Sequence, residues 1–342
     1  MSLIDGFGRP ITYLRLSVTD RCDFRCVYCM SEEMQFLPRE KILSIEEMTF
    51  VARAFTELGV TKVRITGGEP LIRRNIEQLF SNLGALIGLE ELTLTSNGSQ
   101  LVKYAPLLVA SGVKRINISL DSLQAEKFKQ LTRTGKLDQV LGGIDAAINA
   151  GLQVKLNSVI LKSRNSDEVL ALVKFALDKK IDLSFIEEMP LGAISEHQRQ
   201  QEFISSAELR EIIQQEFVLS PSINSPSTNS SSSKKPSKIS SAGPSRYWQT
   251  PGHSSLIGFI SPHSDNFCGD CNRVRVTAEG KLLLCLGNED SLDLRDIIRQ
   301  HPNDIERLKQ HIVAAMAHKP EKHHFDSAGQ TDIVRFMNMT GG

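Results

Sequence analysis

The sequence of 342 residues lacks a net charge and lacks long apolar runs. Forty lysine and arginine residues balance forty aspartate and glutamate residues, so no overall field favours nucleic acid or an anionic membrane as a partner. No apolar run approaches the roughly 18 residues of a membrane-spanning helix. The first residues resemble neither a secretory signal nor an Arg-rich presequence. We therefore expect a cytoplasmic protein that binds neither nucleic acid nor membrane.

Two common nucleotide-binding patterns are absent, and cysteine is scarce. Neither G-x-x-x-x-G-K-[ST] nor G-x-G-x-x-G occurs, so a bound nucleotide would not be held by a P-loop or a Rossmann turn. The six cysteines form two tight groups far apart in the sequence, unlike the dispersed disulfide bridges of small secreted domains. In a reducing compartment, such clustered thiols indicate metal binding.

The first 190 residues alternate between short runs rich in β-branched residues and segments with helical periodicity. Six β/α units in succession predict an α/β fold with a parallel sheet. An open doubly wound sheet is the alternative, but polar residues follow the strands, as they do at the C-terminal rim of a barrel. The expected strands are 13–18, 62–66, 91–95, 114–120, 153–160 and 182–187, and the expected helices are 44–58, 75–87, 101–111, 122–131, 137–150 and 167–179.

This alternation ends near residue 190, which predicts one region of residues 1–190 and a second of residues 191–342. Within the second region, segment 220–244 contains eleven serines and four prolines. Such a segment has too few apolar side chains to offset the entropy of ordering. We predict a disordered insertion at about 220–246, then β-rich segments, helices near 293–300 and 304–317, and a polar tail.

The first cysteine group is Cys22-x-x-x-Cys26-x-x-Cys29, directly after the first expected strand. Three thiolates on so short a loop can hold three irons of a cuboidal [4Fe–4S] cluster and leave the fourth iron open. Zinc, which usually has a fourth protein ligand in structural sites, is an alternative. A redox Cys-x-x-Cys pair is another alternative, although it leaves the third cysteine without a role.

The second cysteine group also has three members, Cys268, Cys271 and Cys285. Three ligands again leave one iron of a cluster open, and an open iron can bind a nitrogen or oxygen atom of a substrate. A structural zinc ion completed by His253 or His263 is the alternative.

Five cations lie in or beside expected strands, where burial is costly without a partner anion. If the strands converge on one cavity, these side chains could bind a triphosphate, with the guanidinium groups gripping its oxygens. Solvated positions or local ion pairs are the alternative for each of them. The five are Arg15, Arg64, Lys155, Arg273 and Arg275.

Further sequence runs surround the cysteine groups and lie between them. The first cysteine spacing, with Tyr28 before the last cysteine, resembles the signature of radical S-adenosylmethionine (SAM) enzymes, and GGEP at 67–70 fits the same group. Six runs together resemble the GTP 3′,8-cyclase family of molybdenum-cofactor biosynthesis over nearly the whole chain apart from the Ser/Pro insertion. They are LRLSVTDRCDFRCVYCM, VRITGGEPLIR, LTLTSNG, RINISLDSL, FCGDCNRVRVTAEGKLLLCL and the terminal GG.

The resemblance implies a fold and its cofactors. The fold is an incomplete six-stranded (β/α) barrel of the radical SAM type, followed by a C-terminal region that carries a second iron–sulfur cluster. The cofactors are two [4Fe–4S] clusters and SAM. The implied cluster ligands are the six cysteines, and the implied SAM contacts are Tyr28, Gly68, Ser119 and Met189. The implied GTP contacts are Arg15, Arg64, Thr95, Lys155, Arg273, Val274 and Arg275.

The resemblance also implies a reaction. Reductive cleavage of SAM gives a 5′-deoxyadenosyl radical, which takes the ribose H3′ of GTP, and C3′ then bonds to C8 to give 3′,8-cyclo-7,8-dihydro-GTP. Arg15 and a flexible Gly341–Gly342 tail that enters the cavity are implied catalytic elements. The implied partners are a downstream cyclic pyranopterin monophosphate synthase and a flavodoxin or ferredoxin as electron donor. A homodimer stays open.

One residue departs from the family pattern. Ser184 stands where the family commonly has Arg at the start of an R-F-I-E run, so a basic contact near the SAM site is missing or comes from elsewhere. The alternative functions are a radical SAM maturase that modifies a peptide and a non-catalytic module with structural zinc. Asp121, just past the fourth expected strand, is expected to cap the following helix.

Overall fold

The computed structural model describes residues 2–31, 33–194, 197–222, 243–264, 268–323, 325 and 333–341. Most of the predicted Ser/Pro insertion, together with Gly342, lies outside the described residues. Among the described residues, no helix is both long enough and apolar enough to cross a membrane.

The first 190 residues form the six predicted β/α units, with strand ends within one residue of expectation. The strands are β1 (Tyr13–Ser17), β2 (Lys62–Thr66), β3 (Glu91–Ser96), β4 (Val113–Ser119), β5 (Gln153–Val159) and β6 (Asp182–Ile186). The helices are α1 (Ile45–Glu57), α2 (Ile76–Gly84), α3 (Leu101–Ala110), α4 (Ala125–Thr132), α5 (Leu137–Asn149) and α6 (Val169–Lys179). Short 3₁₀ turns lie at Arg39–Lys41, Pro70–Ile72, Ser166–Glu168 and Cys268–Asp270.

Local sequence signals set several helix ends. Ser44 and Glu47 form the capping box that begins α1, with the Ser44 side chain accepting from the Glu47 amide. Helix α4 begins three residues later than expected. The preceding loop is fixed instead by Glu168, whose carboxylate accepts hydrogen bonds from the Ser122 hydroxyl and the Leu123 amide.

The second half of the chain adds strands to both edges of the parallel sheet. The order is β12-β11-β10-β1-β2-β3-β4-β5-β6-β9-β8-β7, and β10 and β9 run parallel to β1 and β6 respectively. Because β1 to β6 follow one another in sequence order, the doubly wound alternative, whose order reverses at a switch point, is wrong. The added elements are α7 (Arg199–Glu202), α8 (Ser206–Gln214), β7 (Ser220–Pro221), β8 (Arg246–Gln249), β9 (Leu256–Ile260), β10 (Arg273–Val276), β11 (Lys281–Leu283), β12 (Ser291–Asp293), α9 (Leu294–Gln300), α10 (Ile305–Met316) and α11 (Met337–Thr340).

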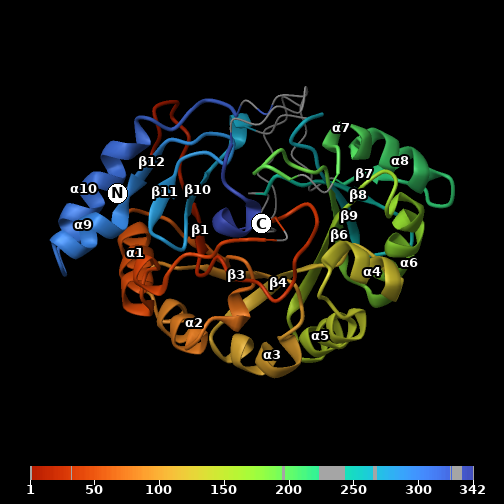
Figure 1. Cartoon of the computed structure of the whole chain (residues 1–342), viewed down its shortest axis with the longest axis horizontal. Helices are drawn as coiled ribbons and strands as arrows, with labels where there is room; N and C mark the ends of the chain where they lie inside the picture. The colour runs from red at the N-terminus through yellow and green to blue at the C-terminus, as the bar shows by residue number, and fades with distance from the viewer. Residues whose placement is uncertain are drawn as a thin grey trace.

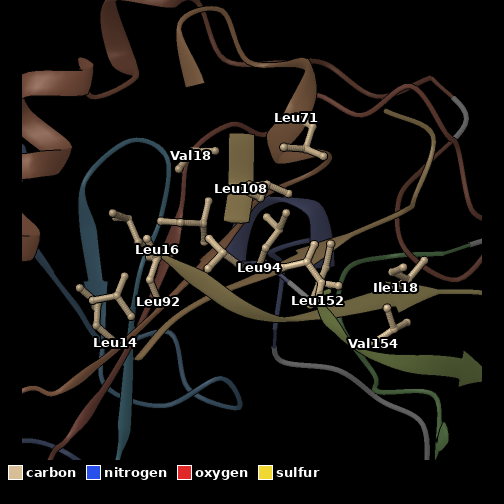
Figure 2. Close-up of a cluster of buried hydrophobic side chains, with 14 of the residues drawn as sticks. Leu14, Leu16, Val18, Leu71, Leu92, Leu94, Leu108, Ile118, Leu152 and Val154 are labelled. Carbon is tan, nitrogen blue, oxygen red and sulfur yellow. The ribbon is translucent and has the colours of Figure 1, made fainter. Parts of the chain in front are cut away.

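The sheet curves into an open arch (Figure 1). Helices such as α1, α2, α3 and α5 cover its outer side, and the C-terminal segment with α11 lies inside the arch. Successive side chains of each strand point to opposite faces of the sheet, so one set faces the helices and the other faces the inside of the arch. Leu14 and Leu16 of β1, and Leu92 and Leu94 of β3, point into the hydrophobic core (Figure 2). The residues between them face the interior of the arch, where a ligand can be bound.

Candidate active site

Two cavities follow one another along the inner face of the sheet. The Cys22 cavity is lined by residues near the carboxyl ends of the strands, such as Thr66, Ser119 and Val159, and has an empty volume of about 1160 Å³. The Cys268 cavity is lined by residues near the amino ends, such as Tyr13 and Lys62, and has an empty volume of about 1530 Å³. These volumes include solvent at the cavity mouths. The residues common to both walls are Arg15, Asn157, Ile186, Met189 and Arg275.

The structure distributes the predicted site residues between these two cavities. The Cys22 cavity holds Cys22, Cys26, Cys29, Tyr28, Gly68, Thr95, Ser119 and Met189. The Cys268 cavity holds Cys268, Cys271, Cys285, Arg15, Arg64, Lys155, Arg273, Val274, Arg275 and again Met189, and Arg15 and Arg275 also line the Cys22 cavity. Thr95 therefore lies among the residues expected to contact SAM, and it approaches the expected GTP residues through Arg64, whose Nη1 lies 3.3 Å from Thr95 Oγ1.

The first cysteine loop is held against α4. The Arg25 amide donates to the Thr132 carbonyl at 2.9 Å and the Val27 amide to the Leu131 carbonyl at 3.0 Å. The rings of Phe24 and Phe128 pack edge to face with centroids 5.9 Å apart. These contacts fix the loop from outside, so that its three thiols can line one cavity.

The GGEP run at residues 67–70 packs against the chain just before the first cysteine group. A Cβ atom on Gly68 would lie 2.1 Å from the carbonyl oxygen of Arg21, so only glycine allows the two chain segments to come this close. The following Glu69 is fully buried. Its carboxylate accepts hydrogen bonds from the amides of Leu71 and Asn97 and from the Ser96 hydroxyl.

The three first-group thiols are free and suited to an iron–sulfur cluster. Burial raises the pKa of Cys22, Cys26 and Cys29, and nearby carboxylates such as Glu69 and Asp121 raise it further. A thiol in such surroundings becomes a thiolate when a metal binds it. Within the described part of the chain, no three His, Cys, Asp or Glu side chains come close enough together to hold a single metal ion. Cluster ligands bind separate irons, so a wider spacing suits them.

Asp121 lies in the Cys22 cavity and does not cap α4, so that expectation is wrong. Gln124 occupies the N-cap position of α4. One Asp121 oxygen accepts from the Tyr28 hydroxyl at 2.7 Å, and the other accepts from the Val159 amide at 2.9 Å. Burial raises the pKa of Asp121 to about 6, although these two hydrogen bonds oppose the rise. No local pattern predicts this pairing, because the two residues are far apart in the chain.

The second cysteine group has basic surroundings. Lys319 is buried, donates to the Leu284 carbonyl at 2.6 Å, and lies 3.7 Å from the Cys271 sulfur. The His323 amide donates to the Cys268 sulfur at 3.4 Å. Burial raises the pKa of Cys271, but Arg273 and Lys319 outweigh it and lower the value to about 7.

The residues needed for the zinc alternative lie elsewhere. Neither His253 nor His263 is among the residues that line the Cys268 cavity. The His263 ring contacts the Glu188 carbonyl at 2.9 Å, and His253 is exposed. The described residues therefore offer no fourth zinc ligand from either of these histidines.

A row of three guanidinium groups crosses the floor of the Cys268 cavity. Arg275, Arg15 and Arg64 occupy matched positions on the adjacent parallel strands β10, β1 and β2. Neighbouring strands lie about 4.8 Å apart, so three like charges are held side by side. Burial, together with the neighbouring arginines, lowers the pKa of Arg15 to about 10 and that of Arg275 well below its usual value. Such an arrangement is stabilised by a bound polyanion.

The C-terminal segment reaches both cavities. The Met337 amide donates to the Cys29 carbonyl at 3.2 Å, and Arg275 donates to the Gly341 carbonyl at 2.6 Å. The φ angle of Gly341 is +74°, and a Cβ atom there would lie 1.9 Å from Thr66 Oγ1. A side chain at position 341 would therefore push the segment away from the sheet.

Ser184 is fully buried, and its hydroxyl lies 2.9 Å from that of Ser245. Gly258 pairs with it on β9, and a Cβ at Gly258 would lie 2.5 Å from the Ser184 hydroxyl. This group of small side chains leaves no room for a long basic side chain without rearrangement.

Comparisons with known proteins match this architecture. Residues 16–176 match the model of the radical SAM superfamily, and residues 181–325 match the model described as Molybdenum Cofactor Synthesis C. The chain is 58% identical to GTP 3′,8-cyclase of Ectopseudomonas mendocina, with 99% of this chain and 98% of the relative covered. It is 57% identical to GTP 3′,8-cyclase 2 of Pseudomonas aeruginosa over the same shares. The chain belongs to the GTP 3′,8-cyclase family.

A solved structure shares the fold of this GTP 3′,8-cyclase family member. SuiB of Streptococcus suis, bound to its precursor peptide SuiA, matches with a TM-score of 0.62 and 17% identity, covering 95% of this chain and 77% of SuiB. At this identity the likeness concerns the fold alone. The predicted radical SAM fold is confirmed, and membership of the family makes the chain an enzyme that uses SAM and [4Fe–4S] clusters.

Proposed function

We propose that this chain converts GTP into 3′,8-cyclo-7,8-dihydro-GTP, the first step of molybdenum-cofactor biosynthesis. The observation that carries the proposal is the joining of two cysteine-lined cavities through a common wall that contains Arg15 and Arg275. One cavity suits a cluster and SAM, and the other suits a second cluster and a polyanion. The high identity to curated members of the family supports the same reaction.

The roles of individual residues follow from this placement. The cluster that Cys22, Cys26 and Cys29 would hold supplies, together with SAM, the radical that removes the ribose H3′ of GTP. The residues proposed to contact SAM are Tyr28, Gly68, Ser119 and Met189. The residues proposed to bind GTP are Arg15, Arg64, Thr95, Lys155, Arg273, Val274 and Arg275. Cys268, Cys271 and Cys285 would hold the second cluster beside the substrate.

The chain's own contribution is to orient and enclose GTP. The guanidinium row would bind the triphosphate, since forked N–H donors match phosphate oxygens. Arg15 and Met189 line both cavities, so they would contact the substrate where it faces SAM. Gly341 would close the space between Arg275 and Thr66. The role proposed for Gly342 falls on a residue outside those described.

The remaining proposals concern location and partners. Residues 1–190 would cleave SAM, and residues 191–342 would add the second cluster and part of the GTP site. The protein would act in the cytoplasm, take electrons from a flavodoxin or ferredoxin, and pass its product to a cyclic pyranopterin monophosphate synthase. A homodimer is the assembly to test by sedimentation.

The decisive experiment is anaerobic turnover. Reconstituted, reduced protein is mixed with SAM and either GTP or ATP, and 5′-deoxyadenosine and nucleotide isomers are followed by mass spectrometry. We expect 5′-deoxyadenosine and a new GTP isomer only in the presence of GTP. Equal 5′-deoxyadenosine without GTP, and no isomer, would leave radical chemistry in place but refute GTP as substrate. A peptide substrate would then be tested next.

A further inference from the structure

Four of the cations that line the Cys268 cavity fall into two pairs with different hydrogen-bond partners. Lys62 and Arg115 both form ion pairs with Glu91, at 2.8 and 2.7 Å. Arg64 and Lys155 instead donate to phenol oxygens. Arg64 Nε lies 2.6 Å from the Tyr13 hydroxyl, and Lys155 Nζ lies 3.0 Å from the Tyr247 hydroxyl. Both tyrosines line the same cavity.

A phenol and a carboxylate have different effects on a cation that must bind an anion. A carboxylate cancels the positive charge and repels an incoming phosphate. A phenol accepts one hydrogen bond and can do so without a full negative charge. Lys62 and Arg115 thus share the single negative charge of Glu91, whereas no carboxylate among the described residues lies within ion-pair distance of Arg64 or Lys155.

The same hydrogen bonds fix where the remaining donors point. Arg64 also donates through Nη1 to the Leu94 carbonyl and the Thr95 hydroxyl. Its Nη2 makes no hydrogen bond to the described residues, and the side chain borders the cavity. Lys155 lies over the Tyr247 ring, 5.3 Å from its centroid. An ammonium group has three N–H donors, so further donors stay available to a ligand.

The two phenols lie on opposite sides of the arch. Tyr13 belongs to β1 and Tyr247 to β8, which occupy separated positions in the sheet order. Arg64 and Lys155 project between them from β2 and β5. Each side of the cavity therefore has one cation whose position is set by one phenol.

We infer that Tyr13 and Tyr247 are positioning residues for the phosphate groups of the substrate, each holding one cavity cation in a binding orientation through a hydrogen bond from the cation to the phenol oxygen. The inference rests on the proposed function and deepens it, because it assigns the selectivity for a nucleoside triphosphate over the bare nucleoside to two further side chains. Removing either hydroxyl leaves a buried cation without its oriented partner.

The test compares GTP with guanosine in the absence of reductant, so that binding is measured without turnover. Tyr13→Phe and Tyr247→Phe are prepared in the reconstituted holoenzyme, and dissociation constants are measured by calorimetry. We expect each variant to bind GTP about threefold to tenfold more weakly. Guanosine affinity should stay unchanged, because guanosine has no phosphate groups.

Tyr104→Phe is a matched control. Its hydroxyl also accepts from a lysine, with Lys103 Nζ at 3.4 Å, but it lies on α3 and does not line the cavity. This variant should bind GTP as the unmodified enzyme does. Iron content and melting temperature are measured for all variants, so that a loss of fold is recognised.

A double-mutant cycle separates positioning from general loosening. In an Arg64→Ala background, Tyr13→Phe should have no further effect on GTP affinity, because the group that it positions is gone. Additive losses would contradict the inference, as would equal weakening of GTP and guanosine, or unchanged GTP affinity in both tyrosine variants. In turnover, KM for GTP should rise while kcat changes little.

The outcomes also distinguish this inference from the proposed function. If the unmodified holoenzyme binds GTP no better than guanosine, the proposed function itself fails. If it prefers GTP and both tyrosine variants keep the full preference, only the role of the phenols is refuted.

Discussion

Around Cys22, Cys26 and Cys29 the charged neighbours that change the thiol pKa are carboxylates and the other thiols. Around Cys271 they include Arg273 and Lys319. Burial raises the pKa in both places, but only at Cys271 do the neighbours reverse the effect. Within the second group the reversal is confined to Cys271, because burial also raises the pKa of Cys268. The two cavities thus differ in the charges beside their thiols, and the cations at Cys271 would suit an anionic substrate.

Loss of either cysteine group should produce the largest effects and should separate their functions. Cys22→Ala removes a proposed ligand of the cluster that binds SAM, so formation of 5′-deoxyadenosine should be abolished. Cys268→Ala leaves that cavity intact, so SAM cleavage should persist while no cyclised nucleotide forms. Both products are measured by mass spectrometry. A Cys22→Ala protein that still makes 5′-deoxyadenosine would disprove the first-cluster assignment.

The fold was largely predictable from the sequence, because alternation of apolar residues and helix-capping signals are local. The capping box at Ser44 and Glu47 and the six strands are examples. The edge pairings of β10 with β1 and β9 with β6 were not predictable. No local signal determines which of many short apolar runs will pair over such a long stretch of sequence.

The same limit applies to the site. The cysteine spacings and the strand-borne arginines identified both groups of candidate residues. The Tyr28–Asp121 and Tyr13–Arg64 hydrogen bonds were not predictable, because each joins residues that are far apart in the sequence and that only the folded chain brings together. A signal for the placement of Tyr13 exists in the strand pattern, because its position two residues before Arg15 places both side chains on the same face.

Removal of one guanidinium group from the Cys268 cavity should strongly weaken the binding of GTP. Arg273→Ala and Arg275→Ala each remove charge-assisted hydrogen bonds worth about 1.5–3 kcal/mol, which corresponds to about 10- to 150-fold in GTP affinity. The measurement is calorimetric titration with GTP in the absence of reductant. Arg53→Ala is the control, because Arg53 pairs with Glu57 on the outer helix α1. Unchanged affinity in both cavity variants would count against the anion site.

Lys319→Met tests whether the positive charge beside Cys271 changes the reduction potential of the second cluster only. The change keeps a long side chain but removes the ammonium group beside the Cys271 sulfur. Positive charge near a cluster favours its reduced form, so the reduction potential of the second cluster should become more negative. The potential of the first cluster should not move. Redox titration followed by electron paramagnetic resonance measures both potentials. Equal shifts of the two potentials would show that Lys319 acts on both clusters alike.

The tyrosines of the two cavities should differ in the pH at which their hydroxyl groups ionise. This effect is smaller than the preceding ones. Burial raises the pKa of Tyr28, and Asp121 raises it further. Burial also raises the pKa of Tyr13, but Arg64, Arg15 and Lys62 outweigh it and lower the value to about 7. The stabilising contribution of the ionised Tyr13 is therefore present above pH 10, the ordinary value, and is lost as the pH falls through about 7.

Ultraviolet absorbance of tyrosinate follows this ionisation. Between pH 6 and pH 8 we expect an increase in the unmodified protein that is missing in Tyr13→Phe and retained in Tyr28→Phe. The same increase in Tyr13→Phe would show that the cations do not act on this phenol.

The pairing of β1 with β10 also bears on how the chain is made. Strand β1 ends at Ser17 and β10 begins at Arg273, so at ribosomal rates the first strand waits roughly 15–50 s for its second neighbour. During synthesis one edge of β1 is open to pairing with other chains. A charged side chain within an edge strand discourages such pairing. Arg15 would thus protect the nascent chain from aggregation before it ever meets a substrate.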